Sequence, residues 1–127
     1  MLANHDAQAT VAVKSLEKAR PFYEGVLGLE PLAGGEPSVQ GYKAGGATVL
    51  VYESQFAGTN QATSITWALG DGFDAAIAAL RAQGARFETY DMPDAKIVDG
   101  VHEFGDMKVV WFKDPDGNIL SCGNYKG

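Results

Sequence analysis

Few residues of this chain carry side chains that catalysis or metal binding usually needs. The histidines are His5, close to the start of the sequence, and His102, which is followed by Glu103. Imidazole and carboxylate groups are common ligands of divalent metals, so a site made of His102, Glu103 and Glu53 stays open from the sequence. Cys122 is the single cysteine, which excludes a disulfide within the chain. It has no neighbouring base, and we expect a small buried apolar residue rather than a nucleophile.

Other familiar catalytic or binding patterns are missing. Ser64 and Ser121 have no histidine partner that the sequence places nearby, and the glycine pairs at 34–35 and 45–46 lack the Lys-Ser/Thr signature of a phosphate-binding loop. Lys and Arg total 10 against 16 Asp and Glu, a formal charge of −6, and no basic cluster occurs. Nucleic acid and anionic membranes are therefore not expected partners. The start of the sequence does not resemble a secretory signal, so we expect a cytoplasmic protein.

Apolar periodicity predicts a first strand and a first helix. Small or polar residues alternate with apolar ones over residues 7–13, the pattern of a half-buried strand. Ser15 is the predicted N-cap of the helix that follows, and Gly28 can supply its left-handed end. Pro21 falls inside this helix and removes a backbone donor there. We expect the helix to begin late or to bend at Pro21.

The remaining elements are mostly short strands separated by the chain's 16 glycines. A second helix is predicted after Asp71, its N-cap, with an apolar stripe of Phe73, Ile77 and Leu80 and an end at Gly84. Further strands are predicted at residues 29–32, 38–43, 47–53, 64–69, 85–90, 101–103, 107–113 and 118–123.

The element order repeats along the chain. Corresponding residues lie 56 positions apart: Gln8 and Ser64, Ser15 and Asp71, Ala19 and Ala75, and Gly28 and Gly84. A repeat of two units can pair its sheets around a shared cavity instead of stacking as a solenoid. We therefore predict one domain over residues 1–127, with module one at about 7–56 and module two at about 62–125.

Three stretches resemble the vicinal oxygen chelate superfamily, which includes glyoxalase I, bleomycin-resistance proteins and extradiol dioxygenases. They are SLEKARPFYEGVLG at residues 15–28, FDAAIAAL at 73–80 and WFKDPDGN at 111–118. The resemblance implies an α+β fold of two tandem βαβββ modules, whose cupped mixed β-sheets enclose a cleft. We expect structural roles for the motif residues: the first stretch packs a helix on its sheet, and residues 114–118 form a turn between the last two strands.

The resemblance also implies four strand positions that hold a divalent metal in enzymes of the superfamily. The matching residues in this chain are Gln8, Leu50, Ser64 and Ser121. Leucine has no donor atom, and serine hydroxyls are weak ligands beside imidazole or carboxylate. Shifting the fourth strand by an odd number of residues would bring Glu53 into the site, but it would turn the strand's other side chains to the opposite face. We expect no metal cofactor, although a divalent metal is not excluded.

The predicted cleft is neutral and partly apolar. Its lining consists of Gln8, Thr10, Thr48, Leu50, Tyr52, Ser64, Thr66, Trp111 and Ser121. Such a lining suits a small organic molecule held by shape, a few hydrogen bonds and an aromatic face. Resemblance to the antibiotic-binding members implies a metal-free binding protein that acts as a homodimer.

Other functions stay open at this point. One is a divalent-metal lyase or dioxygenase with unusual ligands, and another is a protein-interaction module without any ligand. The cavity can also be collapsed, with its polar lining residues satisfying one another. The sequence does not decide whether a reaction is catalysed, or whether the modules pair within one chain or between two chains.

Overall fold

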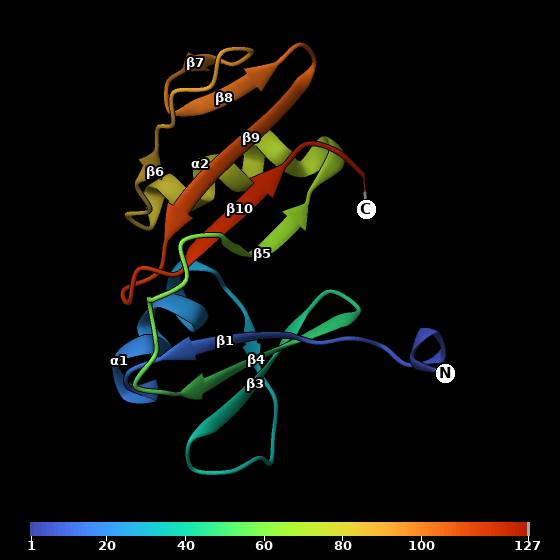
Figure 1. Ribbon diagram of the computed structural model, residues 1–127, viewed down its shortest axis with the longest axis vertical. Helices are drawn as coiled ribbons and strands as arrows, with labels where there is room; N and C mark the ends of the chain where they lie inside the picture. Colours follow the sequence, from blue (N-terminus) through green and yellow to red (C-terminus); the bar gives the residue numbers. More distant parts are fainter. Residues whose placement is uncertain (127) are drawn as a thin grey trace.

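The computed structural model describes residues 1–126, so Gly127, the end of the expected domain, lies outside the described residues. The first half of the chain forms one sheet with the order β1-β4-β3-β2 (Figure 1). Its elements are β1 (Ala9–Val13), α1 (Leu16–Arg20), the π-helix η2 (Pro21–Val26), β2 (Glu30–Pro31), β3 (Val39–Ala44) and β4 (Ala47–Glu53), after a short 3-10 helix η1 (Leu2–Asn4). Strands β1 and β4 are parallel, and the other pairs are antiparallel.

The second half repeats this arrangement. Its elements are β5 (Thr63–Ala68), the 3-10 helix η3 (Gly70–Gly72), α2 (Phe73–Ala82), β6 (Phe87–Glu88), β7 (Lys96–Val98), β8 (Val101–Phe104), β9 (Met107–Lys113) and β10 (Ile119–Gly123). The sheet order is β5-β10-β9-β8-β7, with β6 also paired to β9, and β5 and β10 are parallel. The predicted α+β fold with two mixed sheets is therefore confirmed. Strands β1 and β5 approach one another where the two sheets meet.

The first helix begins and bends where its residues predict. The Ser15 side chain accepts a hydrogen bond from the Lys18 backbone N–H, which makes it the N-cap of α1. At Pro21 the α-helix gives way to η2, whose last turn is closed by the Leu27 N–H donating to the Phe22 carbonyl, five residues back. Because proline has no N–H, the regular ladder is interrupted there and the helix widens. Gly28 then ends it with a φ of 67°.

Three local predictions differ from the structure. Asp71 does not cap α2, because it lies inside η3 and the N-cap residue is Gly72, which has no side chain to donate or accept. The strand predicted at residues 85–90 is reduced to β6, and β7 was not predicted. Residues of β7 are all exposed, so its sequence lacks the alternation of buried and exposed residues that reveals a strand.

One hydrophobic core joins the two halves. Buried residues of α1 and η2, such as Leu16 and Tyr23, and of α2, such as Phe73, pack against strand residues of both sheets, including Val51 and Phe112. Every second strand residue therefore faces the helices. Figure 1 shows α2 behind β9 and β10, so the view looks onto the opposite side of that sheet. We call the strand face turned away from the helices the open face.

The turn between β9 and β10 fastens the second module to the first. Asp114 is buried and accepts hydrogen bonds from the Tyr23 hydroxyl (2.7 Å) and from the Asn118 side chain and backbone (both 2.8 Å). The Asn118 side chain also donates to the Ala12 carbonyl at 2.8 Å. The structural role predicted for residues 114–118 is confirmed.

Candidate functional site

The first sheet brings four of the predicted cleft residues to the open face. Val49 and Val51 of β4 are buried in the core, so Thr48, Leu50 and Tyr52 point the other way. Thr10 of β1 lies beside Leu50 in the parallel pair. These side chains are partly or fully accessible, and Tyr52 is 37% exposed.

Gln8 is placed differently from the other predicted residues. It precedes β1 and is exposed, so no strand pairing fixes its side chain. Whether it lines a ligand site stays a prediction.

The second sheet brings together three predicted residues in one row. Ser121 of β10 lies between Thr66 of β5 and Trp111 of β9. Leu120 is buried on the helix side, which puts these three on the open face. Ser64 lies at a bulge, where the pairing of β5 with β10 shifts by one residue between Ile119 and Leu120. A bulge redirects a side chain locally, and Ser64 is half-buried.

Trp111 has two aromatic neighbours that were not among the predicted lining residues. The His102 ring lies 5.0 Å from the Trp111 ring and the Tyr90 ring lies 5.6 Å from it, both in edge-to-face contact. His102 is fully buried, which is uncommon for histidine. The sequence signal that could have revealed this burial is the position of His102 in a predicted strand, where it alternates with Val101. These rings hold Trp111 in place and give the open face an aromatic wall.

The hydrogen bonds of His102 are incomplete. Its Nε2 lies 2.9 Å from the Tyr90 backbone nitrogen and 3.2 Å from the Tyr90 carbonyl oxygen, so the ring tautomer decides whether Nε2 accepts or donates. Within residues 1–126, Nδ1 has no hydrogen-bond partner although it is buried. This nitrogen is therefore a buried polar atom that the described chain leaves without a hydrogen-bond partner.

Lys43 is a charged residue that the predicted lining did not include. It is exposed on β3 and pairs across the sheet with Thr48, so its ammonium belongs to one end of the open face. The nine predicted lining residues themselves carry no charge.

The residues present do not fit a divalent metal at the four superfamily positions. Leu50 offers no donor atom, and Ser64 and Ser121 offer only hydroxyls. Within residues 1–126, no group of three or more His, Cys, Asp or Glu is arranged to hold an ion.

The alternative site of His102, Glu103 and Glu53 is not assembled either. His102 and Glu103 are consecutive in β8 and point to opposite faces. The Glu53 carboxylate instead accepts from the Leu16 backbone N–H at 2.9 Å, at the start of α1. Glu53 thus stabilises a helix end, where anionic groups are favoured, rather than being simply a solvated strand end.

Cys122 faces the helices and not the open face. It is 4% exposed, as expected of a small buried apolar residue, and burial raises the pKa of its thiol to about 11. Because the thiolate is the reactive form, the group is a poor nucleophile near neutral pH.

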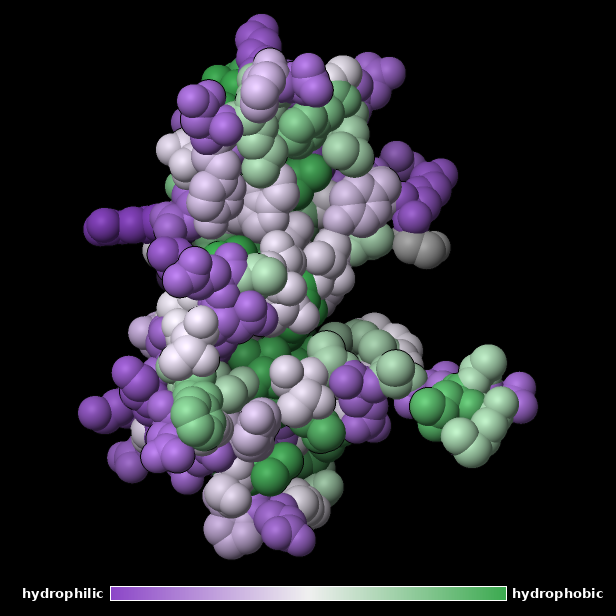
Figure 2. Space-filling view, viewed as in Figure 1, coloured by the Kyte–Doolittle hydropathy of each residue, from purple (hydrophilic) through white to green (hydrophobic). Residues whose placement is uncertain are grey.

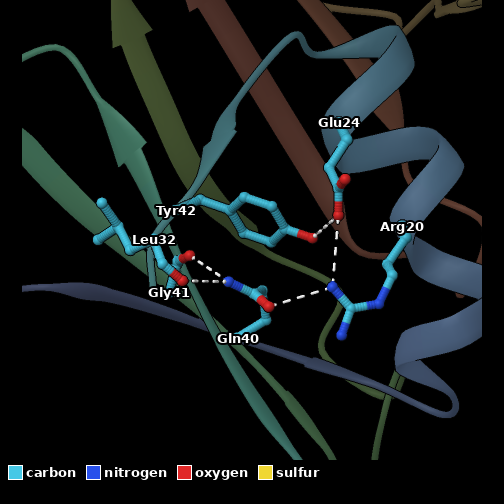
Figure 3. Close-up of polar contacts among 6 residues, drawn as sticks. All are labelled: Arg20, Glu24, Leu32, Gln40, Gly41 and Tyr42. Carbon is cyan, nitrogen blue, oxygen red and sulfur yellow. Dashed lines mark hydrogen bonds and ion pairs between the residues drawn. The ribbon is translucent and has the colours of Figure 1, made fainter. Parts of the chain in front are cut away.

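A polar cluster on the helix side of the first sheet is held by hydrogen bonds and an ion pair among its own members (Figure 3). Arg20 donates to the Gln40 side chain at 3.1 Å and pairs with Glu24 at 3.5 Å, and the Tyr42 hydroxyl donates to Glu24 at 2.8 Å. Gln40 in turn donates to the carbonyls of Leu32 and Gly41. Burial and the hydrogen bond to Glu24 raise the pKa of Tyr42 to about 12. The cluster ties α1 and η2 to β3.

A repeated βαβββ unit with two mixed sheets is the arrangement that the sequence resemblance implies. The sequence profile of the Glyoxalase/Bleomycin resistance protein/Dioxygenase superfamily matches residues 7–121. The chain belongs to this superfamily. None of the curated proteins matches it.

Solved structures of the superfamily share the fold at low sequence identity. A glyoxalase/bleomycin resistance protein/dioxygenase from Alicyclobacillus acidocaldarius is 17% identical, with a TM-score of 0.70 over 98% of this chain and 93% of that one. Lactoylglutathione lyase from Agrobacterium tumefaciens is 19% identical, with a TM-score of 0.65 over 94% and 92%. A fosfomycin resistance protein from Listeria monocytogenes is 16% identical, with a TM-score of 0.65 over 97% and 92%. At these identities the likeness concerns the fold alone. No helix within residues 1–126 has the length and apolar character to cross a membrane.

Proposed function

We propose that the chain binds a small organic molecule on the open face, where its two sheets meet, and that it does so without a metal ion. The observation that supports this most is the chemistry of that face. Thr10 and Thr66 supply exposed hydroxyl groups, Ser121 supplies one that is largely buried between its neighbours, and Trp111 and Tyr52 supply aromatic surface. Binding pockets typically combine such apolar surface with a few polar groups that orient the ligand.

The same chemistry selects the class of ligand. Shape, hydroxyl groups and aromatic contacts favour a molecule with an aromatic part that is neutral or cationic. The chain's formal charge of −6 favours a cation over an anion as it approaches. Lys43 lies at the end of the face, beside Thr48, and gives an anion a single contact there. Bleomycin, which the name of the superfamily mentions, fits this description better than fosfomycin, which is an anion.

We also propose that the chain acts as a homodimer in which a second copy completes the groove. The open face exposes large apolar side chains, including Leu32, Ile97 and Met107, each at least 41% accessible. Figure 2 shows pale and green side chains over the middle of this side of the molecule. Leu32 follows β2 in the first half of the chain, and Ile97 and Met107 lie in β7 and β9, so both sheets contribute exposed apolar side chains of the kind found at protein interfaces. Sedimentation of the purified chain at the mass of two copies would support the proposal, and a monomer at micromolar concentration would contradict it.

Ligand-dependent thermal unfolding tests the binding proposal. Bleomycin is titrated into chelator-treated protein, with fosfomycin as the anionic comparison. A ligand that binds only the folded state raises the unfolding temperature as its concentration increases. We expect such a rise with bleomycin and none with fosfomycin.

Two variants of the same sheet locate the binding. Trp111→Ala removes the aromatic wall of the open face, and we expect it to abolish the bleomycin shift. Phe87→Ala removes an aromatic ring on the helix side, where Phe87 packs against Phe112, and serves as the control for general destabilisation. It should unfold at a lower temperature and keep the shift. An equal shift in wild type and Trp111→Ala, or no shift with bleomycin in any protein, would contradict the proposal.

A further inference from the structure

A cavity lies on the helix side of the second sheet, between the helices of the two modules. Its walls are the end of η2 with the turn to Gly28 on one side and α2 on the other, and its floor is formed by Trp67, Phe112 and Cys122. The volume is about 520 Å³. Cavities that hold small molecules in proteins have volumes of roughly 300–1,000 Å³. The space is therefore large enough for an organic ligand.

The sequence keeps this space empty through small residues on both walls. Gly25 and Gly28 line one wall, and Ala76, Ala79 and Ala82 line the other. A Cβ atom built at Gly25 would meet nothing within 4 Å, so no close packing demands glycine there, whereas the positive φ of Gly28 favours glycine. Gly25, Ala79 and Ala82 are exposed, so the cavity opens to solvent between the two helices and a ligand can enter it.

The backbone of the first helix also shapes the cavity. Pro21 changes the helix to the wider η2, and the Leu29 N–H donates to the Tyr23 carbonyl as the chain leaves it. Val26 and Leu27, at the end of this wide turn, lie at the cavity wall. Single π-turns of this kind are frequent at functional sites.

The lining specifies the chemistry of a ligand. None of the lining residues is charged, and their polar side-chain groups are the Trp67 indole, the Gln83 amide and the Cys122 thiol. The Cys122 side chain is 4% exposed, lines this cavity, and makes no hydrogen bond to another residue of the described chain. Burial raises the pKa of the thiol to about 11, so it stays protonated and can act only as a weak donor to a polarisable ligand.

We propose that this inter-helix cavity is a second ligand site, separate from the open face, and that it takes an uncharged aromatic molecule of about two fused rings. Trp67 and Phe112 provide aromatic surface on the floor, and the alanine and glycine walls leave room for a flat ring system. A charged molecule is disfavoured because nothing in the lining would compensate its lost hydration. The two sites lie on opposite faces of β9 and β10, since Trp111 and Ser121 alternate with Phe112 and Cys122.

The test uses N-phenyl-1-naphthylamine, an uncharged aromatic probe whose emission increases in apolar surroundings. Ala76→Phe places a ring in the cavity, whereas Ala75→Phe places the same ring on the exposed side of α2. We expect the probe to bind wild type and Ala75→Phe alike, and Ala76→Phe to bind it roughly tenfold or more weakly. Equal binding by all three proteins, or no binding by wild type, would overturn the proposal.

Two further measurements keep the test decisive. If Ala76→Phe does not fold, Ala79→Leu fills the same wall with a smaller side chain and takes its place. Cys122 is the only cysteine, so the rate at which a thiol reagent modifies the protein reports on the cavity floor. Saturating probe should slow this modification at least severalfold in wild type, and an unchanged rate would overturn the proposal. Trp111→Ala should bind the probe as wild type does, which separates this site from the open face.

Discussion

Asp114 is the single residue on which the contact between the two modules depends most. Its Oδ2 accepts from the Tyr23 hydroxyl of the first module and the Asn118 amide of the second, while its Oδ1 accepts two backbone N–H groups of its own turn. The carboxylate is only 4% exposed, so each of these donors depends on it rather than on water. The Asp-Pro-Asp-Gly-Asn sequence revealed the turn, but the bond to Tyr23, 91 residues away, is a product of tertiary packing.

Replacing Asp114 with alanine should therefore be costly. Buried donors without an acceptor cost about 1–3 kcal/mol each, and we expect Asp114→Ala to lower the free energy of unfolding by at least about 3 kcal/mol in urea denaturation. Asp116→Ala is the matched control. Its side chain accepts one bond, from the Lys14 backbone N–H in an exposed position, and its loss should cost about 1 kcal/mol or less. Equal losses in the two variants would contradict the role given to Asp114.

The buried tyrosines predict a loss of stability in alkali. Burial and the hydrogen bond to Glu24 raise the pKa of Tyr42 from 10.0 to about 12. Burial and the nearby carboxylate of Asp114 raise the pKa of Tyr23 even more. Between about pH 10 and 12 the unfolded chain releases these protons and the folded chain retains them, so stability falls as pH rises. The unfolding temperature should fall less steeply over this range in Tyr42→Phe than in wild type. Parallel pH profiles would contradict the assignment.

Some features of the first helix follow from its own residues, and others depend on residues far away in the sequence. Its cap at Ser15, its disturbance at Pro21 and its end at Gly28 follow from the properties of those residues alone. The matching prediction for Asp71 was wrong because Gly70, with a φ of 53°, lets the chain form η3 before α2 begins. The role of Glu53 was also hidden, since its partner Leu16 is 37 residues away.

The start of α1 has two side-chain acceptors, which can be removed separately. Ser15 accepts from the Lys18 N–H and Glu53 accepts from the Leu16 N–H. We expect Ser15→Ala and Glu53→Ala each to lower the free energy of unfolding by about 1 kcal/mol, the usual cost of losing a helix cap. Glu17→Ala, on the exposed side of the same helix, is the comparison. A Glu53→Ala protein as stable as wild type would show that Glu53 does not stabilise the helix end.

For the whole molecule, strand periodicity predicted which residues share a face but not what surrounds them. Alternation was enough to assign Thr48, Leu50, Thr66 and Ser121 to the open face, because side chains of a strand alternate. The rings of Tyr90 and His102 around Trp111 come from a loop and a third strand, and only the folded sheet brings them together. The cavity between the helices was likewise not predicted, since it depends on how far apart η2 and α2 pack.

The metal content of the purified chain tests whether the protein works without a metal ion, as we propose. Protein expressed with manganese, iron, nickel and zinc in the medium is freed of loose ions and measured by elemental analysis. Leu50, Ser64 and Ser121 occupy three of the positions that match the ion-holding positions of superfamily enzymes. We therefore expect the chain to carry far less than an equimolar amount of any divalent metal. A chelator should not change its unfolding temperature. A divalent metal close to equimolar with the chain, whose removal lowers the unfolding temperature, would contradict the proposal of metal-free binding.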